Sequence, residues 1–254
     1  MSNGEYRIGG GFGLTEAVKY LLIWNVIVYL LQHYILANGI GFLSTELLVR
    51  VRLHGTLMVQ PYPVGTLETL FGIVPALFWQ KAFIWQPLTY LFLHGGFFHV
   101  FLNMFSLWMF GGDLERLWGT RRFLGYYFFT GIGAGLLTAL LTPHGYVPTI
   151  GASGAIYGIL LAYALYFPDR RILLYFLFPI PVRVFVIIIG AIALLNSVTQ
   201  SADHVAHVAH LGGMLFGWLY FRGMRPGGLG RLFRRRRPAM RVIDFTREND
   251  SRWR

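Results

Sequence analysis

Residues 151–167 read GASGAIYGILLAYALYF, in which a serine between small residues precedes an apolar segment that carries no charge. A second apolar segment, residues 206–221, reads AHVAHLGGMLFGWLYF and carries a histidine near its beginning. Polar and ionisable groups are costly at membrane depth and usually functional there. Ser153 and His210 are therefore a candidate nucleophile and base inside a bilayer.

The composition of the chain indicates a membrane protein. Of its 254 residues, 55% are hydrophobic and 13% are charged, whereas soluble domains carry about 25% charged residues. The apolar segments are long and numerous, so we predict an all-α, polytopic membrane protein with a bundle of six transmembrane helices. The sequence contains no cysteine, which excludes disulfides, thiolate catalysis and cysteine-ligated zinc.

Six helical spans are predicted from the apolar segments. They cover approximately residues 17–36, 97–112, 123–141, 153–167, 184–196 and 206–221. The long segment 37–98 contains several prolines and only short apolar runs, so we expect an external or interfacial loop with short helices. Residues 173–178 are apolar, but Pro179 and Pro181 separate them from the fifth span, which assigns them to an interfacial connection.

Basic residues in the short loops give the orientation. Two loops on one side hold Arg116, Arg121, Arg122, Arg170, Arg171 and Arg183. The loops 142–150 and 197–205 on the other side contain neither lysine nor arginine. The positive-inside rule therefore places both termini in the cytoplasm. The membrane that we expect is a cell (inner) membrane of bacterial type. The predicted parts are a cytoplasmic segment 1–16, a six-span unit 17–221 and a cytoplasmic tail 222–254.

The net charge of +11 is concentrated in that tail, in Arg231 and Arg234 to Arg237. Such a run is compatible with nucleic-acid binding, but its position beside a membrane span favours contact with anionic lipids. We therefore predict the lipid bilayer as a partner and no nucleic acid. No cleavable signal peptide is predicted, because the first sixteen residues are polar and glycine-rich.

Four polar residues from spans two, four and six are expected to lie in one layer. Counted along each helix from its cytoplasmic end, Ser153, His99, His210 and Asn103 lie about 22, 21, 18 and 15 Å above the cytoplasmic side. A hydrocarbon core is about 30 Å thick, so all four lie below the outer surface. Because polar groups facing lipid would lack partners, the layer should line a water-filled cavity that opens outward.

The chemistry that this layer favours is acyl transfer by a serine. A serine hydroxyl needs a neighbouring base, and His210 is that base for Ser153 and later the acid for the leaving amine. Spans four and six contain no acidic residue, and Asp203 is two turns from the histidine. We therefore predict a catalytic dyad, which requires no metal and no cofactor.

An oxyanion site and a helix contact complete the predicted site. The backbone N–H groups at the start of the Ser153 helix are unpaired, and the side chains of His99 and Asn103 share one helix face. Small residues recur on two spans, as Gly154, Gly158 and Ala162 and as Ala209, Gly213 and Gly217. Such stripes allow close helix contact, and Tyr157, one turn from Ser153, is expected to stack on the imidazole.

Simpler interpretations remain for each residue. The serine is also a normal helix N-cap, and Asn103 would also serve as a polar link between spans. His204, His207 and His210 suggest a metal site, although a spacing of three residues spreads them around the helix. A transporter using the same layer is a further alternative, but the cavity would contain no acidic residue to bind a cation.

Three motifs together resemble the rhomboid family of intramembrane serine proteases, over roughly residues 85–221. They are HGGFFH at residues 94–99 followed by Asn103, GASG at residues 151–154, and Ala209-His210 with Gly213 and Gly217. One departure is Trp85-Gln86, where the family often carries Trp-Arg, and it leaves the bonding of the first loop open. The segment 41–65 has no counterpart that we can place.

The resemblance implies a Ser153–His210 dyad that cuts transmembrane or juxtamembrane segments of single-span membrane proteins. It also implies an oxyanion site of Ser153, His99 and Asn103, with Gly151 beside it. His94, Glu115 and Tyr157 match positions that family members use structurally. An inactive relative that binds transmembrane helices as an adaptor is the alternative function. The natural substrate, the cleavage-site preference and the oligomeric state do not follow from the sequence.

Overall fold

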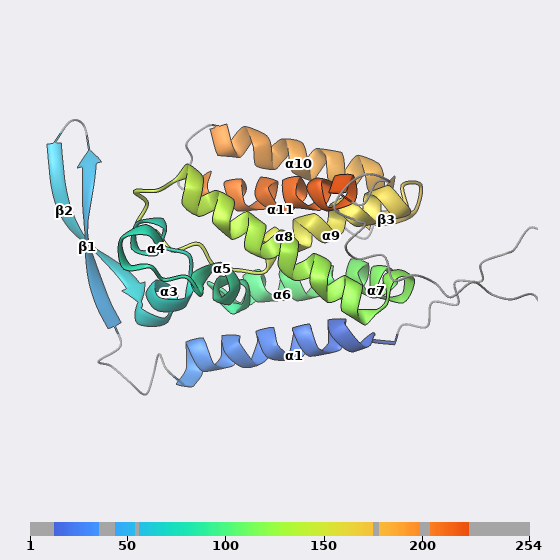
Figure 1. Cartoon of the computed structure of the whole chain (residues 1–254), viewed down its shortest axis with the longest axis horizontal. Helices are drawn as coiled ribbons and strands as arrows, with labels where there is room; N and C mark the ends of the chain where they lie inside the picture. Colours follow the sequence, from blue (N-terminus) through green and yellow to red (C-terminus); the bar gives the residue numbers. More distant parts are fainter. Residues whose placement is uncertain (1–12, 36–43, 54–55, 175–177, 199–203, 224–254) are drawn as a thin grey trace, which may run out of the picture. The chain divides into compact units, whose positions relative to one another are not determined.

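The computed structural model describes residues 13–35, 44–53, 56–174, 178–198 and 204–223 (Figure 1). The chain divides into two compact units, residues 1–220 and 221–254, and the description below concerns the first unit. Its elements are α1 (Glu16–Leu30), η1 (Leu31–Ile35), β1 (Ser44–Leu53), β2 (Thr56–Gly65), α3 (Thr66–Phe71), α4 (Pro75–Lys81), α5 (Gln86–Thr89), η3 (Tyr90–Phe92), α6 (Phe97–Ser106), η4 (Leu107–Gly111), α7 (Gly112–Trp118), α8 (Thr120–Leu141), α9 (Ser153–Tyr166), β3 (Arg171–Leu174), β4 (Phe178–Pro181), α10 (Val182–Val198) and α11 (His204–Gly223).

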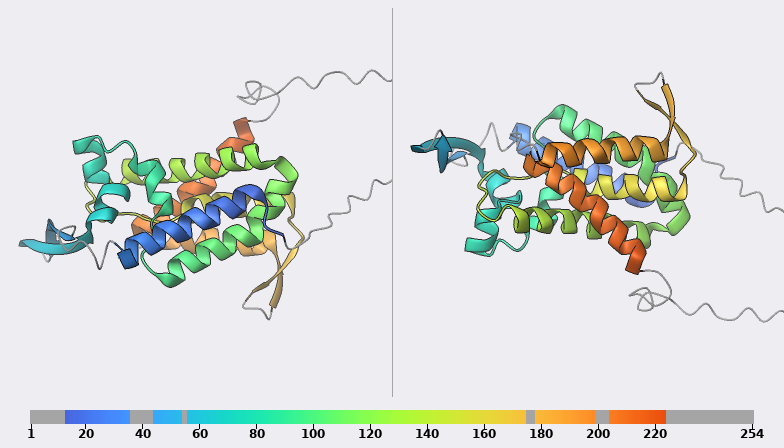
Figure 2. Two further views of the ribbon diagram at one scale, coloured as in Figure 1. Left: turned by 90° about the horizontal axis from the view of Figure 1, so that it is seen from below. Right: turned by 90° about the horizontal axis from the view of Figure 1, so that it is seen from above.

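Helix α8 packs against α9, α5, α4, α1 and α7 (Figure 2). Its buried glycines allow this close packing, because small residues let helix backbones approach one another. A Cβ atom at Gly133 would lie 2.3 Å from the ring of Phe216, and one at Gly135 would lie 2.2 Å from Ile73. The glycines of α8 therefore fix the positions of α11 and of the first loop, both of which contribute to the site.

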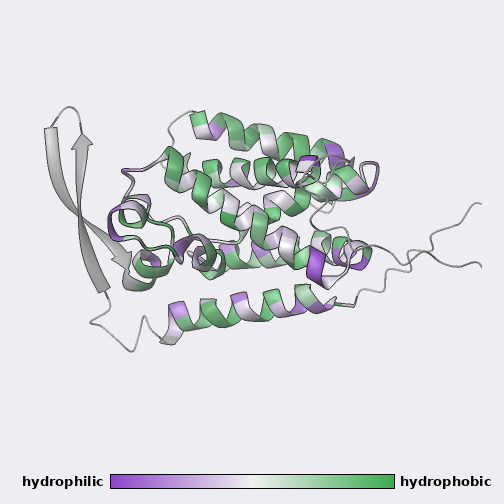
Figure 3. Cartoon of the chain, viewed as in Figure 1, coloured by the Kyte–Doolittle hydropathy of each residue, from purple (hydrophilic) through white to green (hydrophobic). Residues whose placement is uncertain are grey.

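Most of the helices consist largely of hydrophobic residues (Figure 3). Large side chains such as Trp24 on α1 and Ile187 and Leu195 on α10 are 57%, 69% and 65% exposed. A soluble monomer rarely exposes apolar surface in this way, whereas a lipid-facing bundle requires it. Within the described ranges, α8 is the one helix that by itself has the length and hydropathy of a span, and α9 and α10 are apolar but shorter.

The helices coincide with the six predicted apolar segments, with shifted boundaries. The second segment continues from α6 through the π-helical turn η4 into α7 and ends at Trp118, beyond the predicted residue 112. Before it, α5 and η3 form a second arm that is bent by 98° relative to α6–α7. Residues 1–12 and 224–254, which hold most of the predicted terminal segments, lie outside the described residues.

The expectation of an all-α chain is wrong in two places. β1 pairs with β2 in an antiparallel hairpin, with Ser44 opposite Gly65, and β3 pairs with β4, with Arg171 opposite Pro181. Residues 49–53, VRVRL, alternate apolar residues with arginine, which is a strand period that the prediction missed. Prolines are tolerated in β2 and β4 because a two-stranded sheet consists only of edges.

Glu115 fixes the beginning of α1 against α7. This carboxylate is 3% exposed and accepts hydrogen bonds from the backbone N–H groups of Ala17 (2.8 Å) and Val18 (3.0 Å) and from the Thr120 hydroxyl (2.7 Å). Thr15, at the N-cap of α1, makes no side-chain cap bond, so the carboxylate serves as the cap from another helix. Burial alone would raise the pKa of Glu115, but the hydrogen bonds outweigh it and hold that pKa below its usual range.

We expect Glu115→Gln to lower the free energy of unfolding by about 1–3 kcal/mol at pH 7, because an amide places an N–H group against backbone donors. The pKa of Glu115 is lower in the folded state than in the unfolded state. The carboxylate therefore contributes to the free energy of unfolding above its ordinary pKa of about 4.3, and this contribution is lost as pH falls through the folded-state pKa. Unfolding in detergent at pH 7 and at pH 4 measures both effects. Asp169→Asn, at an exposed ion pair with Arg183, is the control and should change little. Equal stability of Glu115→Gln and the parent chain at pH 7 would contradict this role.

Candidate active site

Ser153 and His210 lie within hydrogen-bonding distance although 57 residues separate them in sequence. The Oγ atom of Ser153, the first residue of α9, lies 2.9 Å from Nε2 of His210 on α11. This distance is within the range required for proton transfer between a nucleophile and a base. Both residues belong to the predicted layer.

Glycines on α9 and α11 make this approach possible. A Cβ atom at Gly213 would lie 1.8 Å from the carbonyl oxygen of Gly154, and one at Gly217 would lie 2.6 Å from the Tyr126 hydroxyl oxygen and 3.6 Å from the Cα atom of Gly158. The two helices therefore meet backbone to backbone. Side chains at these positions would hold the two helices, and with them the serine and the imidazole, further apart.

Tyr157 orients the imidazole by stacking. Its ring lies parallel to that of His210, with a centroid distance of 4.2 Å and an angle of 3°. The Nδ1 atom of His210 has no hydrogen-bond partner among the described residues. The ring centroid of His207 lies 5.8 Å from that of His210. Asp203 lies outside the described residues. The described part of the site thus holds the base with an aromatic ring and not with a carboxylate.

Two side-chain donors from α6 converge beside the serine. A Cβ atom at Gly151 would lie 2.5 Å from Nε2 of His99 and 3.7 Å from Nδ2 of Asn103. The Asn103 side chain is buried, and its Nδ2 has no partner in the described part of the chain. Gly151 has a φ of +119°, which disfavours any residue with a Cβ atom. Nε2 of His99 and Nδ2 of Asn103 therefore both lie beside Gly151, two residues before Ser153.

The tautomer of His99 follows from its neighbours. The backbone N–H of Gly95 donates to Nδ1 of His99 at 3.3 Å, so a neutral ring carries its proton on Nε2, the nitrogen near Gly151. His94 packs edge-on against His99, with ring centroids 5.0 Å apart. His94 itself is fully buried, and its backbone N–H donates to Oε1 of Gln32 at 3.1 Å. His94 therefore supports the ring of His99 by packing against it, and its bonds described here are not to Ser153.

Gln86 holds the first loop together, a role that the sequence analysis left open. Its side chain is fully buried. Oε1 accepts a hydrogen bond from the Val74 N–H at 3.2 Å, and Nε2 donates to the carbonyl of Thr69 at 2.9 Å. Tyr90, which the sequence analysis missed, follows in the same loop. Its carbonyl accepts the N–H of Gly151 at 2.9 Å, and its hydroxyl donates to the Gly131 carbonyl at 2.7 Å.

We expect Gln86→Leu to destabilise the chain by about 2–3 kcal/mol, because it leaves a buried N–H and a buried carbonyl unpaired. Thermal unfolding in detergent measures the effect. The matched control is Gln80→Leu, since Gln80 lies exposed on the neighbouring helix α4. A Gln86→Leu variant that unfolds at the same temperature as the control would show that the loop does not depend on these bonds.

The described residues contain no group of three or more His, Asp or Glu side chains arranged to hold a metal ion. The side chain of His204, which the alternative metal site would require, lies outside the described side chains.

The comparisons with known proteins agree on one family. The family model described as "Rhomboid domain" matches residues 81–226, which is more than half of the chain. The chain is 32% identical over 192 residues to "Rhomboid protein 1, mitochondrial" of Saccharomyces cerevisiae, covering 63% of this chain and 53% of that protein. It is 33% identical over 134 residues to "Rhomboid protease GluP" of Bacillus subtilis, covering 53% and 25%. The chain thus spans about half or less of the length of these relatives.

Proposed function

This chain belongs to the rhomboid family of multi-pass membrane proteins, and on that premise we propose that it is an intramembrane serine endopeptidase. Its substrates are transmembrane or juxtamembrane segments of single-span membrane proteins. The observation that carries the proposal is the 2.9 Å contact between Ser153 Oγ and His210 Nε2, with the side-chain N–H groups of His99 and Asn103 beside the nearby Gly151. An adaptor that only binds helices has no need for either the contact or the donors.

In the proposed reaction the Ser153 hydroxyl attacks the scissile carbonyl and gives its proton to Nε2 of His210. The negative charge of the tetrahedral intermediate lies near the backbone N–H groups at the start of α9 and the side-chain N–H groups of His99 and Asn103. The imidazolium then protonates the leaving amine, which separates and leaves an acyl-enzyme. Water, deprotonated by His210, hydrolyses the ester and restores the serine.

The proposed setting is a bundle of six spans over residues 17–221, with both termini in the cytoplasm. Residues 37–98 form its long external loop, and the basic tail 222–254 lies near anionic lipids. The dyad lies in a cavity that opens to the outer face, so that water reaches the acyl-enzyme while lipid does not. The substrate helix enters laterally and unwinds near small or helix-breaking residues, which exposes its carbonyl to Ser153.

A fluorophosphonate probe tests whether the serine is activated. We expect the probe to label the purified full chain in detergent at Ser153, because it reacts with serines that have a base in contact. His210→Asn should lower labelling by about 10²-fold or more. Ser197→Ala is the matched control, because the hydroxyl of Ser197 bonds to the Leu194 carbonyl of its own helix, and it should label normally. A folded chain that takes up no probe would support the adaptor and reject the peptidase.

A further inference from the structure

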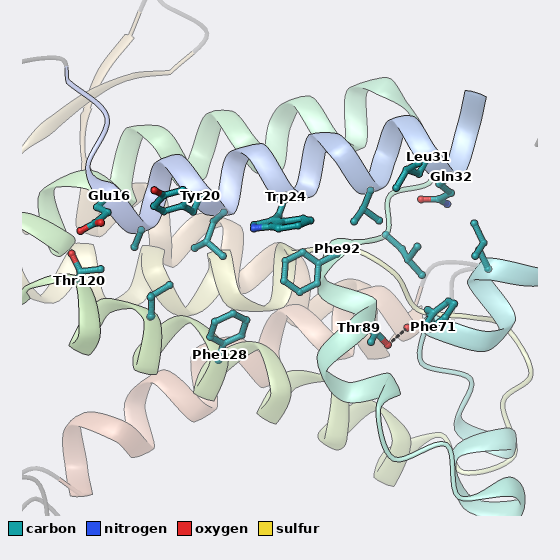
Figure 4. A pocket seen from close by; sticks show the side chains of 16 residues that line it. Glu16, Tyr20, Trp24, Leu31, Gln32, Phe71, Thr89, Phe92, Thr120 and Phe128 are labelled. Carbon is teal, nitrogen blue, oxygen red and sulfur yellow. Dashed lines mark hydrogen bonds between the residues drawn. The ribbon is translucent and has the colours of Figure 1, made fainter. Parts of the chain in front are cut away.

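Gln32 is a buried polar side chain near the end of the first helix. It lies in the π-helical turn η1 that continues α1, and it is 6% exposed. Figure 4 shows its side chain at the same end of the groove along α1 as Phe71 of α3. Burying an amide is costly unless its oxygen and nitrogen are hydrogen-bonded. The partners of Gln32 therefore indicate why an otherwise apolar helix carries this residue.

The two ends of the Gln32 amide bind two different segments of the chain. Oε1 accepts the backbone N–H of His94 at 3.1 Å, and Nε2 donates to Oε1 of Glu68 on α3. A carboxylate only accepts hydrogen bonds, so Glu68 determines which end of the amide faces it. The amide oxygen of Gln32 is consequently turned toward His94.

His94 belongs to residues 93–96, which connect η3 to α6. The other hydrogen bonds that the structure describes for this connection all stay between residues 90 and 100. They join Leu93 to Tyr90, His94 to Phe92, Gly95 to His99 and Gly96 to Val100. Among the described residues, Gln32 is thus the hydrogen-bond partner that links this connection to the first helix.

The position of this connection determines how His99 is held. The backbone N–H of Gly95, the residue after His94, donates to Nδ1 of His99 at 3.3 Å. A neutral His99 ring then carries its proton on Nε2, the atom that lies beside Gly151. Without the Gln32 oxygen, the buried N–H of His94 would lack an acceptor, which is unfavourable. The connection would then shift, and the Gly95 N–H would no longer be directed at His99.

We propose that Gln32 is a positioning residue for the oxyanion donor His99. The inference rests on the proposed function, because it concerns the same reaction. Glu68 orients the Gln32 amide, the amide holds the N–H of His94, and Gly95 is thereby held against Nδ1 of His99. Gln32 acts on the reaction only through His99, so it should affect the chemical step and leave substrate binding unchanged.

Gln32→Leu in the purified full chain tests this role. We expect kcat for a single-span model substrate to fall about tenfold to 10²-fold, because a misplacement of about 1 Å can cost about 10²-fold in rate. KM should stay the same. Gln80→Leu makes the same chemical change at an exposed position of α4 and should retain the kcat of the parent chain. An unchanged kcat in Gln32→Leu would overturn the proposal.

An exchange of the amide and the carboxylate separates bonding from packing. Gln32→Glu alone places two carboxylates against each other and should lower kcat as Gln32→Leu does. Gln32→Glu combined with Glu68→Gln restores a donor and an acceptor, and kcat should return to within about threefold of the parent value. Glu68→Gln alone keeps an acceptor for Gln32 and should retain kcat. A double variant no more active than Gln32→Glu would overturn the proposal.

Nitrogen-15 NMR of the histidine-labelled chain measures the His99 ring directly, because protonated and unprotonated imidazole nitrogens differ in chemical shift. His99→Gln identifies the signals by their loss. We expect the proton on Nε2 in the parent chain and in the exchanged variant, and on both nitrogens in Gln32→Leu. Unchanged His99 signals in folded Gln32→Leu would overturn the proposal, whatever its unfolding temperature. A parent chain that cleaves no substrate would reject the proposed function, and these signals would then decide on Gln32 by themselves.

Discussion

Ser153→Ala abolishes cleavage of a single-span model substrate, by about 10⁴-fold or more, if the proposed reaction holds. The expectation follows from the absence of an alternative nucleophile in contact with His210: its Nε2 bonds to Ser153 Oγ, and its Nδ1 has no partner among the described residues. Removing the hydroxyl leaves the imidazole with nothing to deprotonate except water. Product fragments from the purified variant in detergent, identified by mass spectrometry, measure the loss.

The folding of the Ser153→Ala variant should be unaffected, because the hydroxyl is replaced at the first residue of α9 and no Ser153 cap bond is lost. Its unfolding temperature should therefore match that of the parent chain. His210→Ala should lose activity to a similar extent, since residues that act as a unit are not additive. Cleavage at the original site by folded Ser153→Ala protein would remove the assignment of the nucleophile.

Gly213→Ala should lower both activity and stability, because the added methyl group would push apart the two helices that carry Ser153 and His210. Its Cβ atom would lie 1.8 Å from the Gly154 carbonyl oxygen, a backbone atom that cannot rotate away. Helix α11 must therefore move, and a misplacement of about 1 Å can cost about 10²-fold in rate. Overpacking of this kind costs about 1–3 kcal/mol or more in stability. Cleavage rates and unfolding temperatures of the purified variant measure both effects.

Gly125→Ala is the matched control, since its Cβ atom would have no heavy atom within 4 Å. The same substitution on α8 should be neutral or slightly stabilising, because alanine is a better helix former than glycine. Comparing Gly213→Ala with Gly125→Ala separates the effect of the α9–α11 contact on activity and stability from the general effect of replacing glycine by alanine. Full activity of Gly213→Ala would mean that the approach of α9 to α11 does not position His210.

The candidate site was predictable from the sequence where helix geometry determined it. His99 and Asn103 are four residues apart, so a helix places them on one face, and the glycine stripes on two spans predicted where backbones would meet. The stacking of Tyr157 also followed from its position one turn from Ser153. These inferences needed only the rise and period of a helix, which do not depend on the rest of the fold.

The loops were not predictable in the same way. The role of Gln86 depends on Thr69 and Val74, and the contact of Tyr90 with Gly151 joins residues 61 positions apart. Such bonds arise from tertiary placement, for which the local sequence carries no period. The hairpin of β1 and β2 did have a local signal, the alternation in residues 49–53, but the prolines of β2 favoured an irregular loop.

In the proposed reaction, the hydrogen bond from the Gly95 amide to His99 offers a second way in which activity can be lost. That amide determines which ring nitrogen carries the proton, and hence whether the imidazole donates toward the serine or presents a lone pair there. A shift of residues 92–96 would therefore leave Ser153 able to react with a small electrophile while peptide hydrolysis fails. Probe labelling and proteolysis would then report two separate properties of the same molecule.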